Sequence, residues 1–294
     1  MTRPALTLVA SLALASAAHA QHAGMDMGPA SPSAKALQQI EQVKQATQTF
    51  AAPEQARAAG FGPVLNWLPT MGIHWINLGR QQQSGRNVTI TAPDQLMFSP
   101  MNGKDALVGA AYSFIVPLSD SARPATFDGN PGWHDHPQFA PEGSTLAMLH
   151  VWFVPSPDGP FAGHNPNLPF WALGLTPPPA DRFKDAAESV RIRKAALALG
   201  VVVDTAGLFP TLAQRPEVHS ALVSHRDAIR SLVSRLDAKG VTDWASWDKT
   251  ADDAAAHWDA VRALYLGSVR SPAVRARMTK VMDEMETGAH GHAH

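Results

Sequence analysis

The chain has 294 residues, of which 45% are hydrophobic and 17% are charged, and its formal net charge is −1. This length suffices for one large domain or two smaller ones, and the balanced charge excludes a nucleic-acid-binding protein that acts through bulk positive charge. Because cysteine is absent, disulfides, thiolate zinc sites, iron–sulfur clusters and cysteine nucleophiles are excluded, and any metal must use His, Met, carboxylate or backbone ligands.

The first 20 residues have the pattern of a secretory signal peptide. A basic residue near the start precedes an apolar stretch, which ends in the small-residue sequence Ala18-His19-Ala20. This pattern predicts cleavage after Ala20, and the apolar stretch is too short to span a membrane. We therefore expect a periplasmic or secreted protein with no membrane span.

Residues 21–34 are small, polar and rich in Met and His, which predicts a flexible arm. The next segment, residues 35–60, has apolar residues at helical spacing, which predicts a helix, and Pro53 is placed to begin a second short helical stretch that ends at Gly60. The apolar residues of the first helical face are Leu37, Ile40, Val43 and Ala46.

Residues 61–179 alternate between short apolar runs and turn-forming Gly, Pro and Asn, which predicts a β-rich sandwich or barrel-like sheet. The expected strands are Val88–Ile90, Gln95–Phe98, Ala106–Val116 and Thr145–Val154. In the last run, side chains alternate between two apolar faces, so we expect a central strand that holds His150 in a covered environment. Met148, His150 and Trp152 share one of those faces.

Residues 180–287 have helical periodicity, and residues 288–294 form a His-rich tail. Pro216 is placed to begin one helix of this region. Two apolar stripes at helical spacing predict its main helices: Val218, Leu222, Ile229, Leu232 and Leu236; then Trp244, Trp247, Ala251, Ala254, Trp258, Val261 and Tyr265. The expected fold class is thus α+β, with an N-terminal helix, a β-rich middle and a C-terminal group of helices.

Histidine is the main chemical feature, with 13 residues in the chain. Several occur in the β-rich middle, and His134 and His136 project to the same side if their segment is extended. We expect a site for copper or zinc made by His74, His134, His136 and His150. The alternative is that each is a core histidine, hydrogen-bonded to backbone or buried water, and this alternative also applies to the nearby His164.

The two ends of the chain carry a second group of possible ligands. Imidazole binds Cu(II) and thioether favours Cu(I), so mixed His and Met segments suit copper in both redox states, although a solvated tail without function has the same composition. The expected weak ligands are His22, Met25, Met27, His290, His292 and His294. By contrast, we interpret His225 and His257 as structural, because neither has a His partner one turn away on its own helix.

Several short motifs occur together within residues 66–170. They are Met71-Gly72-Ile73-His74-Trp75, Pro93–Phe98, Leu107-Val108-Gly109 with Tyr112, Leu149-His150-Val151-Trp152, and Gly159–Ala162 with Asn165-Pro166-Asn167. In this order they resemble a set of uncharacterised secreted bacterial proteins, and the resemblance implies a shared β-rich fold without an activity. Those proteins carry Glu before the tyrosine, whereas this chain has Ala111, so a three-His, one-Glu centre would lack its carboxylate here.

These observations favour a periplasmic metal-binding protein, for copper handling, that uses the central histidines and the tails. Two alternatives stay open. One is a metal-dependent enzyme with an open His-ligated position, in which Asp135 is the nearest possible general base. The other is a non-catalytic binding module of unknown ligand. A pocket beside three ligands would favour the enzyme, and scattered histidines would favour the module.

Overall fold

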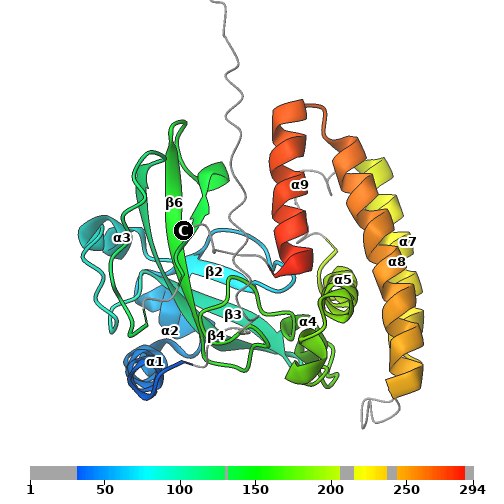
Figure 1. Ribbon diagram of the computed structural model, residues 1–294, viewed down its shortest axis with the longest axis horizontal. Helices are drawn as coiled ribbons and strands as arrows, with labels where there is room; N and C mark the ends of the chain where they lie inside the picture. Colours follow the sequence, from blue (N-terminus) through cyan, green and yellow to red (C-terminus); the bar gives the residue numbers. More distant parts are fainter. Residues whose placement is uncertain (1–31, 130–131, 206–214, 237–243, 289–294) are drawn as a thin grey trace, which may run out of the picture. The chain divides into compact units, whose positions relative to one another are not determined.

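The structure, a computed structural model, describes residues 32–129, 132–205, 215–236 and 244–288. It confirms the expected α+β class, because a β-sheet in the middle of the chain is preceded and followed by helices (Figure 1). The signal segment 1–20, the ligands of the arm and those of the tail lie outside the described residues.

All six described strands belong to one antiparallel sheet, with the order β1-β2-β3-β4-β6-β5. We expected either a sandwich of two sheets or one barrel-like sheet. The described part of the chain has one sheet. The strands are β1 Gly62–Pro63, β2 Ile73–Ile76, β3 Gln95–Met101, β4 Lys104–Pro117, β5 His134–His136 and β6 Ser144–Trp152.

One expected strand is wrong, and three of the described strands, β1, β2 and β5, were not expected. Val88–Ile90 is not a strand; its apolar side chains pack against the sheet from a loop, and the Ile90 carbonyl accepts a hydrogen bond from the Tyr112 hydroxyl. The short strands β2 and β5 form because each pairs with a longer neighbour, β3 and β6 respectively. Such pairing is a tertiary contact, which a four-residue or three-residue pattern does not reveal.

The two faces of the sheet have different covers. One face, which includes Tyr112 and Leu149, packs against Ile40 and Val43 of helix α1 (Ala34–Thr47). The opposite face packs against Leu168 of helix α4 (Leu168–Ala172), and its sheet residues are Met97, Ala111, Leu146, Met148 and Trp152. Since both faces are covered, β6 is buried along nearly its whole length, as its double apolar pattern indicates.

The helical segment expected over 35–60 is divided into three parts. Helix α1 is capped by the Ser33 side chain, which accepts a hydrogen bond from the Ala36 amide. A 3₁₀ turn, η1 (Gln48–Phe50), follows it, and Pro53 then begins α2 (Pro53–Ala58). The remaining short helical elements of this half are α3 (Leu78–Ser84) and η2 (Pro137–Phe139).

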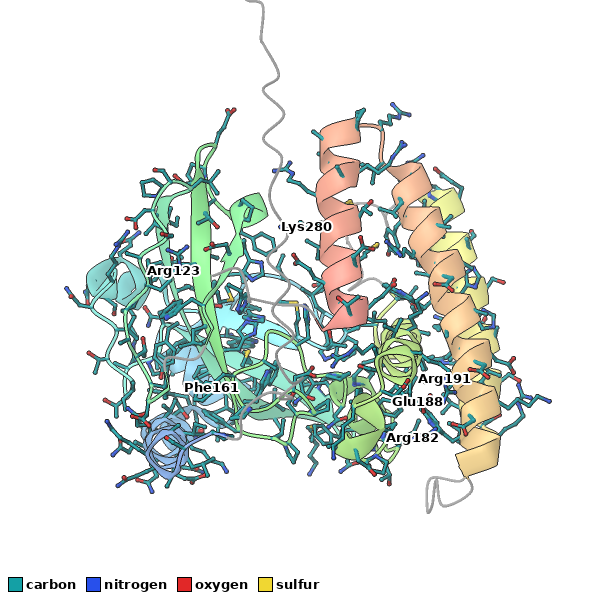
Figure 2. The ribbon with its side chains drawn as sticks, in the orientation of Figure 1. Arg123, Phe161, Arg182, Glu188, Arg191 and Lys280 are labelled. Carbon is teal, nitrogen blue, oxygen red and sulfur yellow. The ribbon has the colours of Figure 1, made fainter. Side chains whose placement is uncertain are left out.

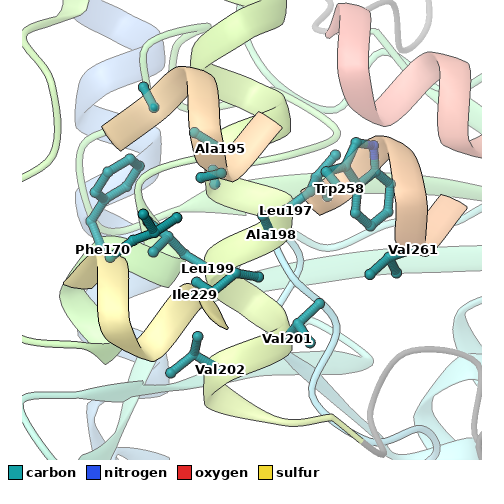
Figure 3. Close-up of a cluster of buried hydrophobic side chains, with 14 of the residues drawn as sticks. Phe170, Ala195, Leu197, Ala198, Leu199, Val201, Val202, Ile229, Trp258 and Val261 are labelled. Carbon is teal, nitrogen blue, oxygen red and sulfur yellow. The ribbon is translucent and has the colours of Figure 1, made fainter. Parts of the chain in front are cut away.

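The C-terminal helices surround α5. They are η3 (Ala180–Phe183), α5 (Ala186–Val203), α7 (Pro216–Val233), α8 (Trp244–Ser268) and α9 (Pro272–Thr287). Helix α5 packs against α7, α8 and α9, so apolar residues occupy several of its faces (Figure 3). Every described side chain of the two expected apolar stripes is buried in this core, including Trp247 and Trp258. The side chain of Trp244 lies outside the described set.

Ion pairs join the helices to one another and to a loop beside the sheet. Arg182, Glu188 and Arg191 lie together next to one end of α8, and Arg191 Nη2 is 2.8 Å from Asp248 Oδ1 (Figure 2). Separately, the buried Arg193 of α5 donates to Asp158, which lies in the loop that follows β6. The same loop contains Gly163, so this ion pair joins the loop of Gly163 to helix α5. In the described part of the chain, no helix is long and apolar enough to cross a membrane.

Candidate metal centre

The register of the sheet places four histidines on the face that α4 covers. In β6, His150 and Met148 alternate onto this face, and β5 pairs so that His134 is opposite Met148 and His136 is opposite Leu146. His74 reaches the same face from β2, where its cross-strand partner is Met97. We call His74, His150, His134 and His136 the histidine row.

The rings of the histidine row contact one another in sequence. Nε2 of His74 is 3.1 Å from Nε2 of His150. The His150 ring centroid is 4.8 Å from that of His134, which is in turn 4.9 Å from that of His136. The structure therefore brings all four expected ligands together, but as a row of neighbours and not as four nitrogens around one point.

The His74–His150 pair has the spacing of two ligands on one metal ion. Two imidazole nitrogens bound to a tetrahedral metal at the usual Zn–N distance lie about 3.3 Å apart, close to the 3.1 Å between the Nε2 atoms. Burial lowers the pKa of His74 to about 4, so this imidazole is neutral at pH 7 and has a lone pair that a metal can use.

The other ring nitrogen of His150 is held by the backbone. His150 Nδ1 is 2.9 Å from the Gly163 carbonyl oxygen, and because that oxygen can only accept, Nδ1 must donate. In a neutral His150 the lone pair is therefore on Nε2, the atom that faces His74. An Nδ1–H bonded to a backbone carbonyl is the usual second contact of a metal-ligating histidine.

Met148 is a potential ligand that sequence reasoning placed on the correct face but did not include in the site. Its sulfur is 3.1 Å from Nε2 of His150, and Nε2 of His74 is also 3.1 Å from that atom, so His150 Nε2 has both a second imidazole nitrogen and a sulfur beside it. The signal was the i, i+2 spacing of Met148 and His150 in an alternating strand. It was overlooked because a methionine in an apolar strand is usually a core residue.

Two small residues of β4 lie on the face that carries this group. Gly109 and Ala111 lie on the same face, and Ala111 is directly opposite His150. Ala111 is therefore next to the histidine row. Asp135, the nearest possible general base, does not join the row, because it alternates to the opposite side of β5, is half exposed and is paired with Arg123 at 2.6 Å.

His164 is buried in the same loop as Gly163, but its described contact is different. Its Nδ1 is 3.1 Å from the Thr70 hydroxyl oxygen, and the neighbouring Asn165 amide donates to the Thr70 carbonyl. These contacts tie the loop after β6 to the segment before β2. His164 therefore helps to fix the loop whose carbonyl orients His150.

The two helical histidines, which we interpret as structural, contact each other across two helices. Nδ1 of His225 in α7 is 3.1 Å from Nδ1 of His257 in α8. Burial, followed by the proximity of His257, lowers the pKa of His225. The partner was missed because it comes from a neighbouring helix rather than from the next turn of the same one.

In the described residues, no group of three or more His, Cys, Asp or Glu side chains is arranged to hold a metal ion. The three-ligand group found above differs in composition, because its third member is a methionine. A surface hollow of about 540 Å³ lies beside strand β1 and the end of β2. Its lining includes Arg57, Phe61, Val64, Asn77 and Leu78. None of its lining residues belongs to the histidine row.

No protein-family model, no curated protein and no solved structure matches this chain.

Proposed function

We propose that this protein binds a transition-metal ion through His74 and His150, with His134 and His136 as adjoining imidazoles. The observation that carries the proposal is the 3.1 Å separation of the two Nε2 atoms, together with the bond between His150 Nδ1 and the Gly163 carbonyl. The first gives the spacing of two ligands, and the second fixes the tautomer that leaves His150 Nε2 available.

Burial supports a binding protein over an enzyme. All four histidines are at most 6% exposed, and His150 is fully buried. A catalytic metal needs an open position for water or substrate beside its protein ligands, whereas a buried ion is protected from exchange. The arrangement therefore favours holding the metal rather than presenting it to a substrate.

Copper handling in the periplasm is the setting that we propose for this activity. Residues 1–20 have the pattern of an export signal, and the arm and tail carry further His and Met residues. The ligands at the chain ends bind copper weakly, so they fill only at copper concentrations above those that fill the buried site. Because they belong to the same chain, copper bound to them raises the local concentration of the ion near that site.

The test is a competition titration of the purified full-length protein with Zn(II) and with Cu(II). A chelator keeps the free concentration of each metal too low for the weak ligands of the tails to bind it. We expect one tight site in the wild type and its loss in the double variant His74→Gln, His150→Gln. Far-UV circular dichroism of the apo-proteins checks that the variant is folded.

The helices offer a matched control, because His225 and His257 also lie 3.1 Å apart. The double variant His225→Gln, His257→Gln should retain the tight site, since this pair is only partly buried and belongs to the helices rather than to the sheet. If the helical variant loses the tight site while the sheet variant keeps it, or if both keep it, the proposal is wrong.

A further inference from the structure

We propose that Met148 is the third ligand of this centre and that the centre of His74, His150 and Met148 is therefore a site for Cu(I). This inference rests on the proposed metal-binding function and specifies its metal. It adds a residue that is not a histidine, and it gives a role to the close approach of the Met148 sulfur to His150.

The contact is between two atoms that can each only accept. In a neutral His150 whose Nδ1 donates to Gly163, Nε2 carries a lone pair, and a thioether sulfur likewise has no proton to donate. Nε2 of His150 and the sulfur of Met148 are nevertheless 3.1 Å apart. A cation bound to both atoms turns this approach of two lone pairs into a favourable arrangement.

The backbone of the sheet fixes the face and the neighbours of Met148, so its location near His150 does not depend on its side-chain conformation alone. Met148 is the residue next to His150 on the same face of β6, and it pairs directly with His134 of β5. It is 5% exposed, so a metal beside it would have little access to water. The sulfur therefore lies beside His150 Nε2, which also contacts His74, in a buried surrounding.

Ligand chemistry then selects the ion. Thioether is a soft ligand that favours Cu(I), whereas Zn(II) prefers imidazole, thiolate and carboxylate. The chain has no cysteine, and Ala111 occupies the position opposite His150 where a carboxylate could otherwise be supplied. Two imidazoles, one thioether and no thiolate or carboxylate make a set that suits Cu(I) better than Zn(II).

The competing explanation is that Met148 only fills the apolar cluster with Leu146, Trp152 and Leu168. Met148→Leu separates the two, because leucine conserves the apolar volume and removes the sulfur. Met285→Leu is the matched control, since Met285 is equally exposed, at 5%, but belongs to the core of the helices.

The experiment measures Cu(I) affinity of the full-length variants anaerobically against bicinchoninate, and Zn(II) affinity against a chromophoric zinc chelator. We expect Met148→Leu to weaken Cu(I) binding by about tenfold or more while Zn(II) binding changes much less. X-ray absorption of the Cu(I) protein, loaded below one equivalent, should show a sulfur neighbour in wild type and in Met285→Leu but not in Met148→Leu.

Unchanged Cu(I) affinity and a retained sulfur neighbour in Met148→Leu would overturn the assignment of Met148, and so would equal losses of Cu(I) and Zn(II). Both results leave the histidine pair as the metal site. If the wild type and the His74→Gln, His150→Gln variant bind both metals equally, the proposed function itself fails, and the role of Met148 fails with it.

Discussion

His150 links His74 and Met148 in the candidate centre. One ring nitrogen bonds the loop after β6 through Gly163, and the other approaches both His74 and Met148. Because the residue is fully buried in mid-strand, its polar atoms must be satisfied within the protein. The hydrogen bond to Gly163 does this for one nitrogen, and the other is 3.1 Å from Nε2 of His74, a partner that can donate a hydrogen bond to it in the metal-free protein.

Ala111 allows the centre to be extended by one carboxylate. We expect Ala111→Glu and Ala111→Gln to destabilise the apo-protein by about 1–3 kcal/mol, because each adds a large side chain at a fully buried position. With Zn(II) present, only the glutamate adds a hard ligand next to His150. The melting temperature should therefore rise more with Zn(II) for the Glu variant than for the Gln variant. An equal rise would show that residue 111 does not face the metal.

Asp94 should give the protein a pH dependence that is separate from the histidines. Burial raises the pKa of its carboxyl from 3.8 to about 6, although hydrogen bonds from Ser113 lower it. Between these values the folded state holds the proton more tightly than the unfolded state, so this group's contribution to stability is lost as the pH rises from 4 to 6.

The measurement is urea unfolding of wild type and Asp94→Asn at several pH values. The stability difference, wild type minus variant, should fall by about 2 kcal/mol between pH 4 and pH 6 and become constant above about pH 7. A difference that is flat across the range, or that grows with pH, would contradict the raised pKa.

At the scale of elements, periodicity predicted what depends on one segment at a time. The apolar stripes of α7 and α8 and the double apolar pattern of β6 are properties of single elements, and the structure bears them out. The short strands β2 and β5 and the His225–His257 pair depend on a partner far away in the chain. Local patterns contain no information about such partners.

Gly200 of α5 illustrates the same division between local preference and packing. Helix propensity alone favours Gly→Ala by about 1 kcal/mol, but a Cβ at Gly200 would lie 2.4 Å from Cγ of Pro69. We expect Gly200→Ala to destabilise the protein by about 1–3 kcal/mol, because the rigid proline ring cannot move aside easily. Chemical denaturation measures this value.

Gly267 of α8 is the control for that substitution, since among the described residues no atom outside its own stretch of helix lies within 4 Å of the position its Cβ would occupy. Gly267→Ala should leave stability unchanged or raise it by up to about 1 kcal/mol. If the two substitutions have the same effect, α5 does not approach the segment before β2 as closely as the structure shows.

At the scale of the whole molecule, the α+β class and the histidines worth testing could be predicted from the sequence, but the arrangement of the centre could not. The i, i+2 spacing of His134 and His136 requires only an extended strand. That His74 reaches His150 across two intervening strands depends on the order and curvature of the sheet. The resemblance to uncharacterised secreted proteins stays a prediction.

The ligands at the C-terminal end of the chain should affect how many Cu(II) ions the protein binds, and not how tightly the buried site binds its metal. Gly288 caps α9 in a left-handed conformation and packs beside Arg193, so a truncation should begin after it. Deletion of residues 289–294 removes His290, His292 and His294 and should lower the number of weakly bound Cu(II) ions, because imidazole binds this ion. Equilibrium dialysis measures that number. A fall of several degrees in the melting temperature would contradict the interpretation of this segment as a weak ligand tail.

The central claim is that the buried histidine pair holds a metal ion, and thermal unfolding of wild type and His150→Ala, each with and without Zn(II), tests it most directly. A ligand that binds only the folded state stabilises it by about 3 kcal/mol at a hundredfold excess over its Kd. We expect Zn(II) to raise the melting temperature of the wild type by several degrees and to leave that of His150→Ala unchanged. Equal shifts in the two proteins, or a shift in neither, would contradict the account.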